Sequence, residues 1–178
     1  SAAYNDGYNF NTGQFSGEQY YYSRTNFEAS PLNRPILSMS AGLNWVGASR
    51  GISSQYLLNP SADSVHVWTI AGTLGSIPTT NSSAIYPNGQ LSKALIIDEQ
   101  GHQVVEYKDK GGKVVLKKVQ LASSPGTAHV GWLCTYYVYD DMDLLRFVIQ
   151  PLAVQQINST WSISTGIANE LCFRYEYD

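Results

Sequence analysis

A close succession of apolar segments and short glycine turns between residues 91 and 122 constrains the fold of this 178-residue chain most strongly. The segments LSKALII, HQVVEYK and KVVLKKVQLA are rich in β-branched residues and are joined by the turns DEQG and DKGG. Each connection has hairpin length, and Gly101 and the pair Gly111-Gly112 can adopt the positive φ that tight hairpins need. The sequence therefore predicts an antiparallel meander of hairpins.

The rest of the chain also favours strands. Its 13 tyrosines, 15 glycines and 7 prolines are typical of many short strands joined by tight turns. Residues 64–70 alternate like a strand, and VGWLCTYYVYD carries apolar groups on both faces, which predicts a strand covered on both sides. Helical spacing of apolar residues occurs at residues 152–171. We expect a mostly β fold with one or two short helices there.

Local composition predicts three regions within one compact unit. Residues 1–19 are polar and glycine-rich and are expected to be flexible. Residues 20–85 are expected to form an N-terminal β subregion, and residues 86–178 are expected to hold the meander and its helical insert. A stretch rich in Gly, Ser, Thr and Pro marks the predicted boundary near residue 85. The polar start and the strand-like end suggest a piece of a longer protein.

The charge of the chain argues against two classes of partner. With 11 basic and 14 acidic residues the net charge is −3, which gives no electrostatic footprint for nucleic acid or an anionic membrane surface. No apolar run approaches the roughly 20 residues that cross a bilayer, so no membrane insertion is expected. The lysine-rich stretch 108–118 is predicted to be the solvent face of a hairpin.

One phrase of the sequence recurs. The segments EYKDKGGKVVL, VYDDMDLLRF and YEYD align on Asp109, Asp140 and Asp178, and this alignment places Gly112 opposite Asp143. We expect each tyrosine ring to cover cross-strand neighbours while its hydroxyl reaches water or a backbone carbonyl. We expect each aspartate to cap its turn by accepting backbone N–H bonds.

The same segments carry a family resemblance. YVYDDMDLLRFVIQP and LCFRYEYD resemble the tyrosine-aspartate (YD) repeats of bacterial RHS (rearrangement hot spot) proteins, whose characteristic form is YxYDxxGxL. NFEASPLNRP, GLNW and DEQGHQVVEYKDKGGKVVLKK look like the module that precedes or begins the repeat array in these proteins. Asp143 departs from the pattern, because the repeat has glycine there, so the units are degenerate. The candidate structural motif residues are Tyr107, Asp109, Gly112, Tyr137, Tyr139, Asp140, Tyr175, Tyr177 and Asp178.

The resemblance implies an architectural role. YD repeats of related proteins form long β-sheets that spiral into a hollow shell, which often encloses a C-terminal toxin or effector, and the proteins are secreted or displayed at the cell surface. This chain would start or cap such a shell, since an array needs an atypical end that protects its first sheet edge. The expected partner is the downstream YD repeats of the same polypeptide, with a glycan or cell-surface target as a further candidate.

The residues give little support for catalysis. His66, His102 and His129 do not have the spacing of a metal site, and neither GxSxG nor HExxH occurs. We therefore expect a protein that is not an enzyme and has no cofactor. Cys134 and Cys172 lie in strand-like segments, where buried thiols are expected rather than a disulfide bridge.

Two other interpretations of side-chain clusters stay open. Carboxylates at turns could bind calcium, although solvated turn carboxylates without a 12-residue ligand loop are the expected outcome. These carboxylates are Asp98, Glu99, Asp140, Asp141 and Asp143. The alternative function is a carbohydrate-binding β-domain in which exposed aromatic rings, with Trp68 and Trp132 as candidates, stack on sugars.

Overall fold

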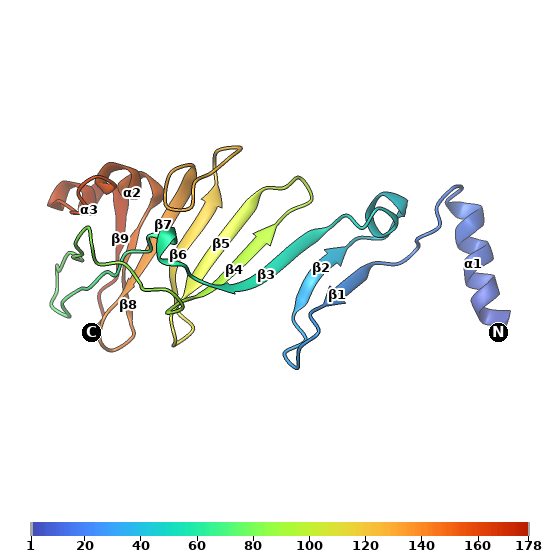
Figure 1. Ribbon diagram of the computed structural model, residues 1–178, viewed down its shortest axis with the longest axis horizontal. Helices are drawn as coiled ribbons and strands as arrows, with labels where there is room; N and C mark the ends of the chain where they lie inside the picture. Colours follow the sequence, from blue (N-terminus) through green and yellow to red (C-terminus); the bar gives the residue numbers. More distant parts are fainter. Residues whose placement is uncertain (1, 178) are drawn as a thin grey trace. The chain divides into compact units, whose positions relative to one another are not determined.

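The computed structural model describes residues 2–177, and the protein is mostly β, as predicted (Figure 1). Nine strands form an antiparallel meander in which neighbours in the sheet follow one another along the chain. The strands are β1 (Arg24–Phe27), β2 (Pro35–Met39), β3 (Ile52–Leu58), β4 (Ser92–Ile97), β5 (Gln103–Lys108), β6 (Val114–Gln120), β7 (Trp132–Tyr139), β8 (Leu145–Ile149) and β9 (Cys172–Arg174).

One helix precedes the meander, and shorter helices lie between its strands. The helices are α1 (Ala2–Gln14), the π-helix η1 (Leu43–Gly47), the 3₁₀-helix η2 (Ser61–Asp63), α2 (Pro151–Ile157) and α3 (Thr165–Leu171). α2 begins with a proline, whose missing N–H costs nothing in a first turn. α3 begins after Ser164, whose Oγ accepts the Ile167 N–H at 3.3 Å. The prediction of one or two short helices at residues 152–171 is confirmed, and the number is two. α1 lies in the segment predicted to be flexible, and that flexibility stays a prediction.

The chain divides into two compact units. Unit 1 comprises Ser1–Gln55 and Ile96–His102, and unit 2 comprises Tyr56–Leu95 and Gln103–Asp178. The boundary predicted near residue 85 lies within unit 2, and the three-part division drawn from composition stays a prediction.

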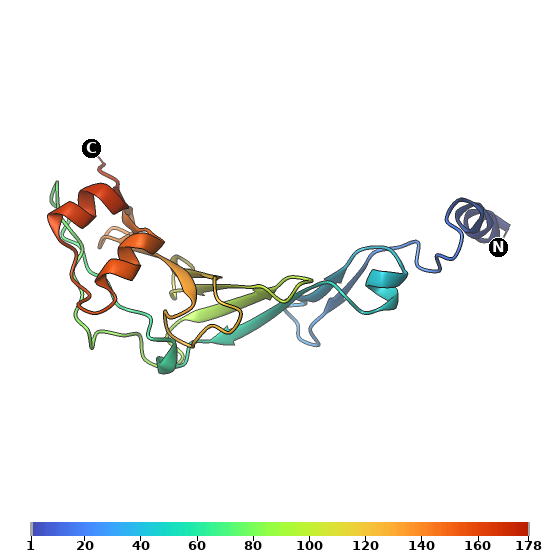
Figure 2. The same cartoon turned by 90° about the horizontal axis from the view of Figure 1, so that it is seen from above.

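Most of the core of unit 2 lies on one face of strands β5 to β8. Tyr107, Leu116, Tyr136 and Ile149 are cross-strand partners in successive pairs, and each is at most 1% exposed. Figures 1 and 2 show α2 and α3 beside the strands β7 to β9. The helix residues Ala153, Val154, Ile157 and Ala168 belong to the same buried apolar cluster. The helices therefore cover the face that these rows of side chains form.

The opposite face of β7 is only partly covered. The alternation of the strand buries Trp132, Cys134, Tyr136 and Val138, as its period predicts. Leu133 on the other face is 37% exposed. The prediction of a strand covered on both sides is therefore wrong, because the buried cluster contains side chains from one face of this strand only.

A long connection between β3 and β4, residues 59–91, packs against the core of unit 2, and we call it the excursion. The predicted strand at residues 64–70 is wrong: the segment makes only two isolated β-bridges, His66 with Ile85 and Thr69 with Thr79. Proline interrupts the partner segment at Pro78 and Pro87, where no N–H is available for a continuous ladder. The segment nevertheless packs against the core, since Val65 is 1% exposed and the adjacent His66 is 4% exposed.

Unit 1 contains β1, β2 and the first residues of β3, up to Gln55. β1 pairs with β2 from Arg24↔Met39 onward, and β2 pairs with β3 at Leu37↔Ser53 and Ser38↔Ile52. The strands approach so closely at Gly51 that an added Cβ would lie 2.1 Å from the Ser38 carbonyl oxygen, so only glycine fits there.

Candidate functional site

Two turns of the predicted repeat have the same hydrogen bonds. The carboxylate of Asp109 accepts the N–H of Lys113 at 2.9 Å, and that of Asp140 accepts the N–H of Leu144 at 2.9 Å. In each turn the aspartate N–H also donates to the carbonyl of that same residue, at 2.9 and 3.0 Å. Both aspartates therefore cap their turns in the predicted way.

The fourth position of each turn has a positive φ. Gly112 has φ 82°, and Asp143 has φ 66°. Aspartate is one of the few residues that adopt this left-handed region without a large penalty. The substitution of glycine by aspartate in the second unit thus changes the residue and keeps the turn conformation.

A third copy of the turn begins at Asp98. Its Oδ1 accepts the N–H of Gln100 at 2.9 Å and that of His102 at 2.8 Å, and Gly101 has φ 91°. These bonds hold the pKa of the Asp98 carboxyl below its usual range, although desolvation opposes them. The repeated phrase of the sequence does not include this third turn, because isoleucine and not tyrosine precedes Asp98. The pattern Asp-x-x-Gly was the signal that could have found it.

A tyrosine before the aspartate holds each repeat to the preceding one. Tyr139 Oη donates to the Val114 carbonyl at 3.1 Å, and Tyr177 Oη donates to the Leu145 carbonyl at 2.9 Å. Val114 follows Asp109 by five residues, and Leu145 follows Asp140 by five. The two bonds, which we call the tyrosine clamps, therefore join equivalent positions of successive repeats.

The other predicted motif residues lie in different environments. Tyr107 is buried in the core, where burial raises the pKa of its phenol, because it occupies the inward position that Val138 has in the next unit. Tyr137 is half-buried, and Tyr175 is exposed with its N–H bonded to the Arg146 carbonyl at 2.9 Å. Asp178 lies outside the described residues. Tyr107 therefore does not share the position of the other tyrosines.

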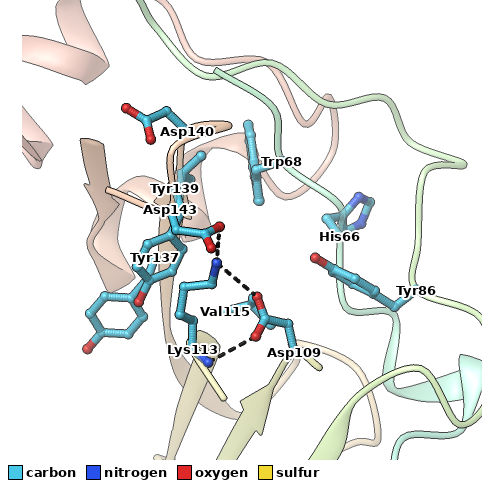
Figure 3. A pocket seen from close by; sticks show the side chains of 11 residues that line it. His66, Trp68, Tyr86, Asp109, Lys113, Val115, Tyr137, Tyr139, Asp140 and Asp143 are labelled. Atoms are coloured by element: carbon cyan, nitrogen blue, oxygen red, sulfur yellow. Dashed lines mark hydrogen bonds and ion pairs between the residues drawn. The ribbon is translucent and has the colours of Figure 1, made fainter. Parts of the chain in front are cut away.

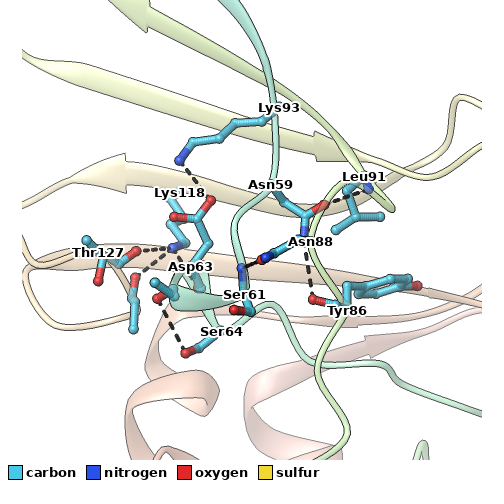
Figure 4. A network of polar contacts seen from close by, with 12 residues as sticks. Asn59, Ser61, Asp63, Ser64, Tyr86, Asn88, Leu91, Lys93, Lys118 and Thr127 are labelled. Carbon is cyan, nitrogen blue, oxygen red and sulfur yellow. Dashed lines mark hydrogen bonds and ion pairs between the residues drawn. The ribbon is translucent and has the colours of Figure 1, made fainter.

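A buried lysine anchors the loops that cover the core (Figure 4). Lys118 is 1% exposed, and its Nζ donates to the carbonyls of Asp63 at 3.3 Å, Thr127 at 2.9 Å and Ala128 at 2.6 Å. Desolvation lowers the pKa of its ammonium to about 8. The prediction that this lysine lies on a solvent face is wrong. Lys117 and Lys118 are adjacent in a strand, so their side chains must point to opposite faces.

The same network ties the excursion to the sheet. Asp63 accepts a 2.8 Å bond from Lys93, and the side chains are 4% and 16% exposed. Asn59, at the start of the excursion, bonds its far end: the Asn59 Oδ1 accepts the Leu91 N–H at 2.7 Å, and its Nδ2 donates to the Pro87 carbonyl at 2.9 Å. The network satisfies buried polar groups and holds the loop in place. These hydrogen bonds and this ion pair support a structural role for the network.

Histidines and aromatic rings form a second buried group. The Tyr136 hydroxyl accepts the backbone N–H of His66 at 3.0 Å, and it forms a second hydrogen bond, 2.8 Å long, with His129 Nε2. Trp161 stacks on His66 with ring centroids 3.5 Å apart. Burial, with help from the Lys118 charge, lowers the pKa of His129 to about 3. Both imidazoles are neutral near pH 7, because burial also lowers the pKa of His66.

A cavity of about 170 Å³ opens beside the turns of Asp109 and Asp140 (Figure 3). Lys113 lies in it between the carboxylates of Asp109 and Asp143, with which it forms ion pairs. Trp68 also lines this cavity. Trp132 lines a different one and is 8% exposed, with its Nε1 bonded to the Gly126 carbonyl at 2.7 Å. The two tryptophans therefore do not form a shared stacking platform.

The two cysteines do not form a disulfide with each other. Cys134 and Cys172 are free, and burial raises the pKa of each thiol to about 11, which disfavours the nucleophilic thiolate. Within residues 2–177 no three His, Cys, Asp or Glu side chains are grouped so that they could hold a metal ion. The described helices include none of the length and apolarity that a bilayer crossing requires.

Comparison with known proteins adds one match. A family model described as a domain of unknown function (DUF6443) matches residues 1–58, from the start of the chain to the end of β3. No curated protein matches the chain, and no solved structure matches it. Residues 1–58 are therefore similar to a domain whose description states no activity.

Proposed function

We propose that this chain is a non-catalytic structural module of a large secreted or surface-displayed YD-repeat protein of the RHS type. In that role it starts or caps a β-shell, which in such proteins often encloses a C-terminal effector. Its partner is the set of downstream YD repeats in the same polypeptide.

The observation that carries the proposal is the equivalence of the two tyrosine clamps. Each joins a tyrosine directly before a repeat aspartate to the carbonyl five residues after the preceding aspartate. A cation lies over each ring: Lys113 Nζ is 5.4 Å from the Tyr139 centroid, and Arg146 Cζ is 5.8 Å from the Tyr177 centroid. A recurring bond of this kind favours a repeat unit over a coincidence of composition.

The last strand supports a continuing sheet. β9 pairs with β8 at Phe147↔Arg174, Val148↔Phe173 and Ile149↔Cys172, and it is the final strand in the order of the sheet. Its other side has no strand partner among residues 2–177. Exposed Phe173 stands on this edge. A free edge is a template for a further strand, and a following repeat would cover it within the same polypeptide.

Hydrogen exchange tests the proposal in a longer polypeptide that contains this chain and its following YD repeats. We expect the outward-facing amides of Cys172–Arg174 to exchange slowly in the longer polypeptide and fast in the present chain, because a new strand pairs with them. Amides of β7, which is paired on both sides, provide the control and should be protected in both. Fast exchange of the β9 edge in the longer polypeptide would contradict the proposal.

A further inference from the structure

A second cavity of unit 2, with a volume of about 390 Å³, is lined by the sheet and by the β6–β7 loop. The sheet contributes Leu95, Val105, Lys118 and Trp132, one from each of β4 to β7, and the loop contributes residues 123–127. None of its described lining residues also lines the cavity of Figure 3. Its volume lies in the range of small-molecule sites, roughly 300–1,000 Å³.

Two lysines that line this cavity occupy the core side of the sheet. Lys118 is the cross-strand partner of the buried Val105, and residues directly opposite each other in an antiparallel pair face the same side. The Nζ of Lys93 lies 5.5 Å from the ring centroid of the buried Tyr107. Lysine on the core face departs from the apolar pattern of a sheet, and such departures are expected at functional sites.

The charges of the cavity do not cancel. Its charged lining residues, within the described part of the chain, are Lys93, Lys118 and Asp63. Lys93 pairs with Asp63 at 2.8 Å, so one positive charge is left over. Desolvation lowers the pKa of Lys118, and the neighbouring charge of Lys93 lowers it further. A buried charge without a counter-charge costs free energy, so a bound anion with one negative charge would stabilise the cavity.

One of the two ammonium groups has N–H donors to offer a ligand (Figure 4). The three donors of Lys118 are used by three backbone carbonyls, so Lys118 contributes its charge and no further hydrogen bond. Lys93 donates once, to Asp63, and its other two N–H groups have no acceptor among residues 2–177. Its side chain is 16% exposed, so a ligand in the cavity can reach it. The exposed Ser123 and Ser124 add hydroxyl groups at the loop.

We propose that this cavity binds a small organic monocarboxylate with an apolar body. The carboxylate accepts an N–H of Lys93, and the apolar body packs against Leu95 and Trp132. A phosphate fits less well, because its charge of about −2 would leave a negative charge beside Asp63. The site goes beyond the structural role proposed above, because a module of a β-shell does not need a ligand in order to pair its strands.

NMR titration of the intact, ¹⁵N-labelled chain tests the site with benzoate as the probe. We expect benzoate to shift the indole N–H signal of Trp132 and the amide signals of residues 123–127. Benzyl alcohol has the same ring without the charge, and it should bind about tenfold more weakly or less, because it lacks a charge-assisted hydrogen bond. Benzylamine and phosphate should bind more weakly than benzoate.

Lysine variants identify the group that binds the carboxylate. Lys93→Met removes the donor and the excess charge, so it should weaken benzoate binding by about tenfold or more. Lys93→Arg keeps the charge and the donors and should retain most of the affinity. Lys117→Met removes the same charge from the opposite face of β6, and it should leave the affinity unchanged.

Four results would each overturn the proposal: no binding of benzoate, equal binding of benzyl alcohol, tighter binding of phosphate, or an unchanged affinity in Lys93→Met. If Lys93→Met does not fold, the comparison of benzoate with benzyl alcohol on the unaltered chain still decides the matter. None of these results bears on hydrogen exchange at β9, so the structural proposal is tested separately.

Discussion

Units 1 and 2 use the same turns and differ in what their strands bury. Every member of the large buried apolar cluster belongs to unit 2. In unit 1 the buried hydrophobic residues are Met39 and Val46 within the described part of the chain. Larger apolar side chains of unit 1 are exposed, among them Phe27, Leu32, Leu43 and Ile52. Unit 2 has a core of its own, and unit 1 is a set of hairpins with a very small one.

The turns show that hairpin geometry does not depend on this core. The turn of Asp98 lies in unit 1, the turns of Asp109 and Asp140 lie in unit 2, and the bonds of the aspartate are equivalent in all three. A capped turn is determined by a few neighbouring residues, whereas burial requires a second layer. Local and tertiary contributions to stability are therefore separable in this protein, and four experiments measure them.

Paired phenylalanine substitutions should give the largest difference. Phe147 is fully buried in unit 2, and Phe27 is 50% exposed in unit 1. Phe147→Ala should lower the free energy of unfolding by about 4 kcal/mol, and Phe27→Ala by less than about 1 kcal/mol. Urea denaturation measures both values. Equal losses would show that unit 1 has a core that its burial does not reveal.

Removal of the buried ammonium should have the next largest effect. Lys118→Met retains the aliphatic stem and leaves three carbonyls without their donor, so we expect a loss of about 3 kcal/mol in the free energy of unfolding. Lys117→Met in the same strand is the control and should change it by less than about 0.5 kcal/mol. In unit 1, Arg34→Met removes the 2.8 Å ion pair to Glu28 at the surface, and its effect should be much smaller than that of Lys118→Met.

Acid should destabilise unit 2 through His129. Its pKa is lowered to about 3 in the folded protein from 6.5, so the unfolded chain binds the proton more tightly. Its contribution to stability is complete above pH 6.5 and is lost as the pH falls toward 3, by about 2 kcal/mol near pH 5. His129→Gln should remove this part of the pH dependence in urea denaturation.

Glycine substitutions in the turns should have small and equal effects. Gly101 of unit 1 and Gly112 of unit 2 have φ of 91° and 82°, and an added Cβ would meet no atom within 4 Å at either position. Alanine at each should cost about 1 kcal/mol, because the left-handed conformation alone is penalised. Unequal losses, measured by hydrogen exchange at each turn, would show that the turns do depend on the surrounding core.

The parts of the fold that could be predicted from sequence are those set by neighbouring residues. The meander after Leu91 follows from turns such as Asp109 to Gly112, and the alternation of β7 correctly separates Tyr136 from Tyr137. The excursion before Leu91 could not be predicted, because its position depends on side-chain bonds across the fold. Asn59, for example, bonds Leu91, which lies far along the chain.

The candidate site was predictable to a similar extent. Aspartate capping followed from residue type, and so did the expectation that a tyrosine hydroxyl reaches a carbonyl. The identity of that carbonyl did not, because Val114 and Tyr139 become neighbours only when β6 and β7 pair. The cavity beside the turns joins Trp68 of the excursion to Asp143 of the β7–β8 hairpin, and no local pattern connects these two residues.

The direction of the tyrosine clamps has a consequence for how such a chain can be assembled. Tyr139 bonds a carbonyl at the start of β6, and Tyr177 bonds one at the start of β8, so each ring fastens to a segment already synthesised. A polypeptide that is synthesised amino end first can therefore form each of the two clamps as soon as its tyrosine has been made, because the accepting carbonyl is already present. Pairing of the sheet can thus proceed in one direction, from the amino end of the chain to its carboxyl end.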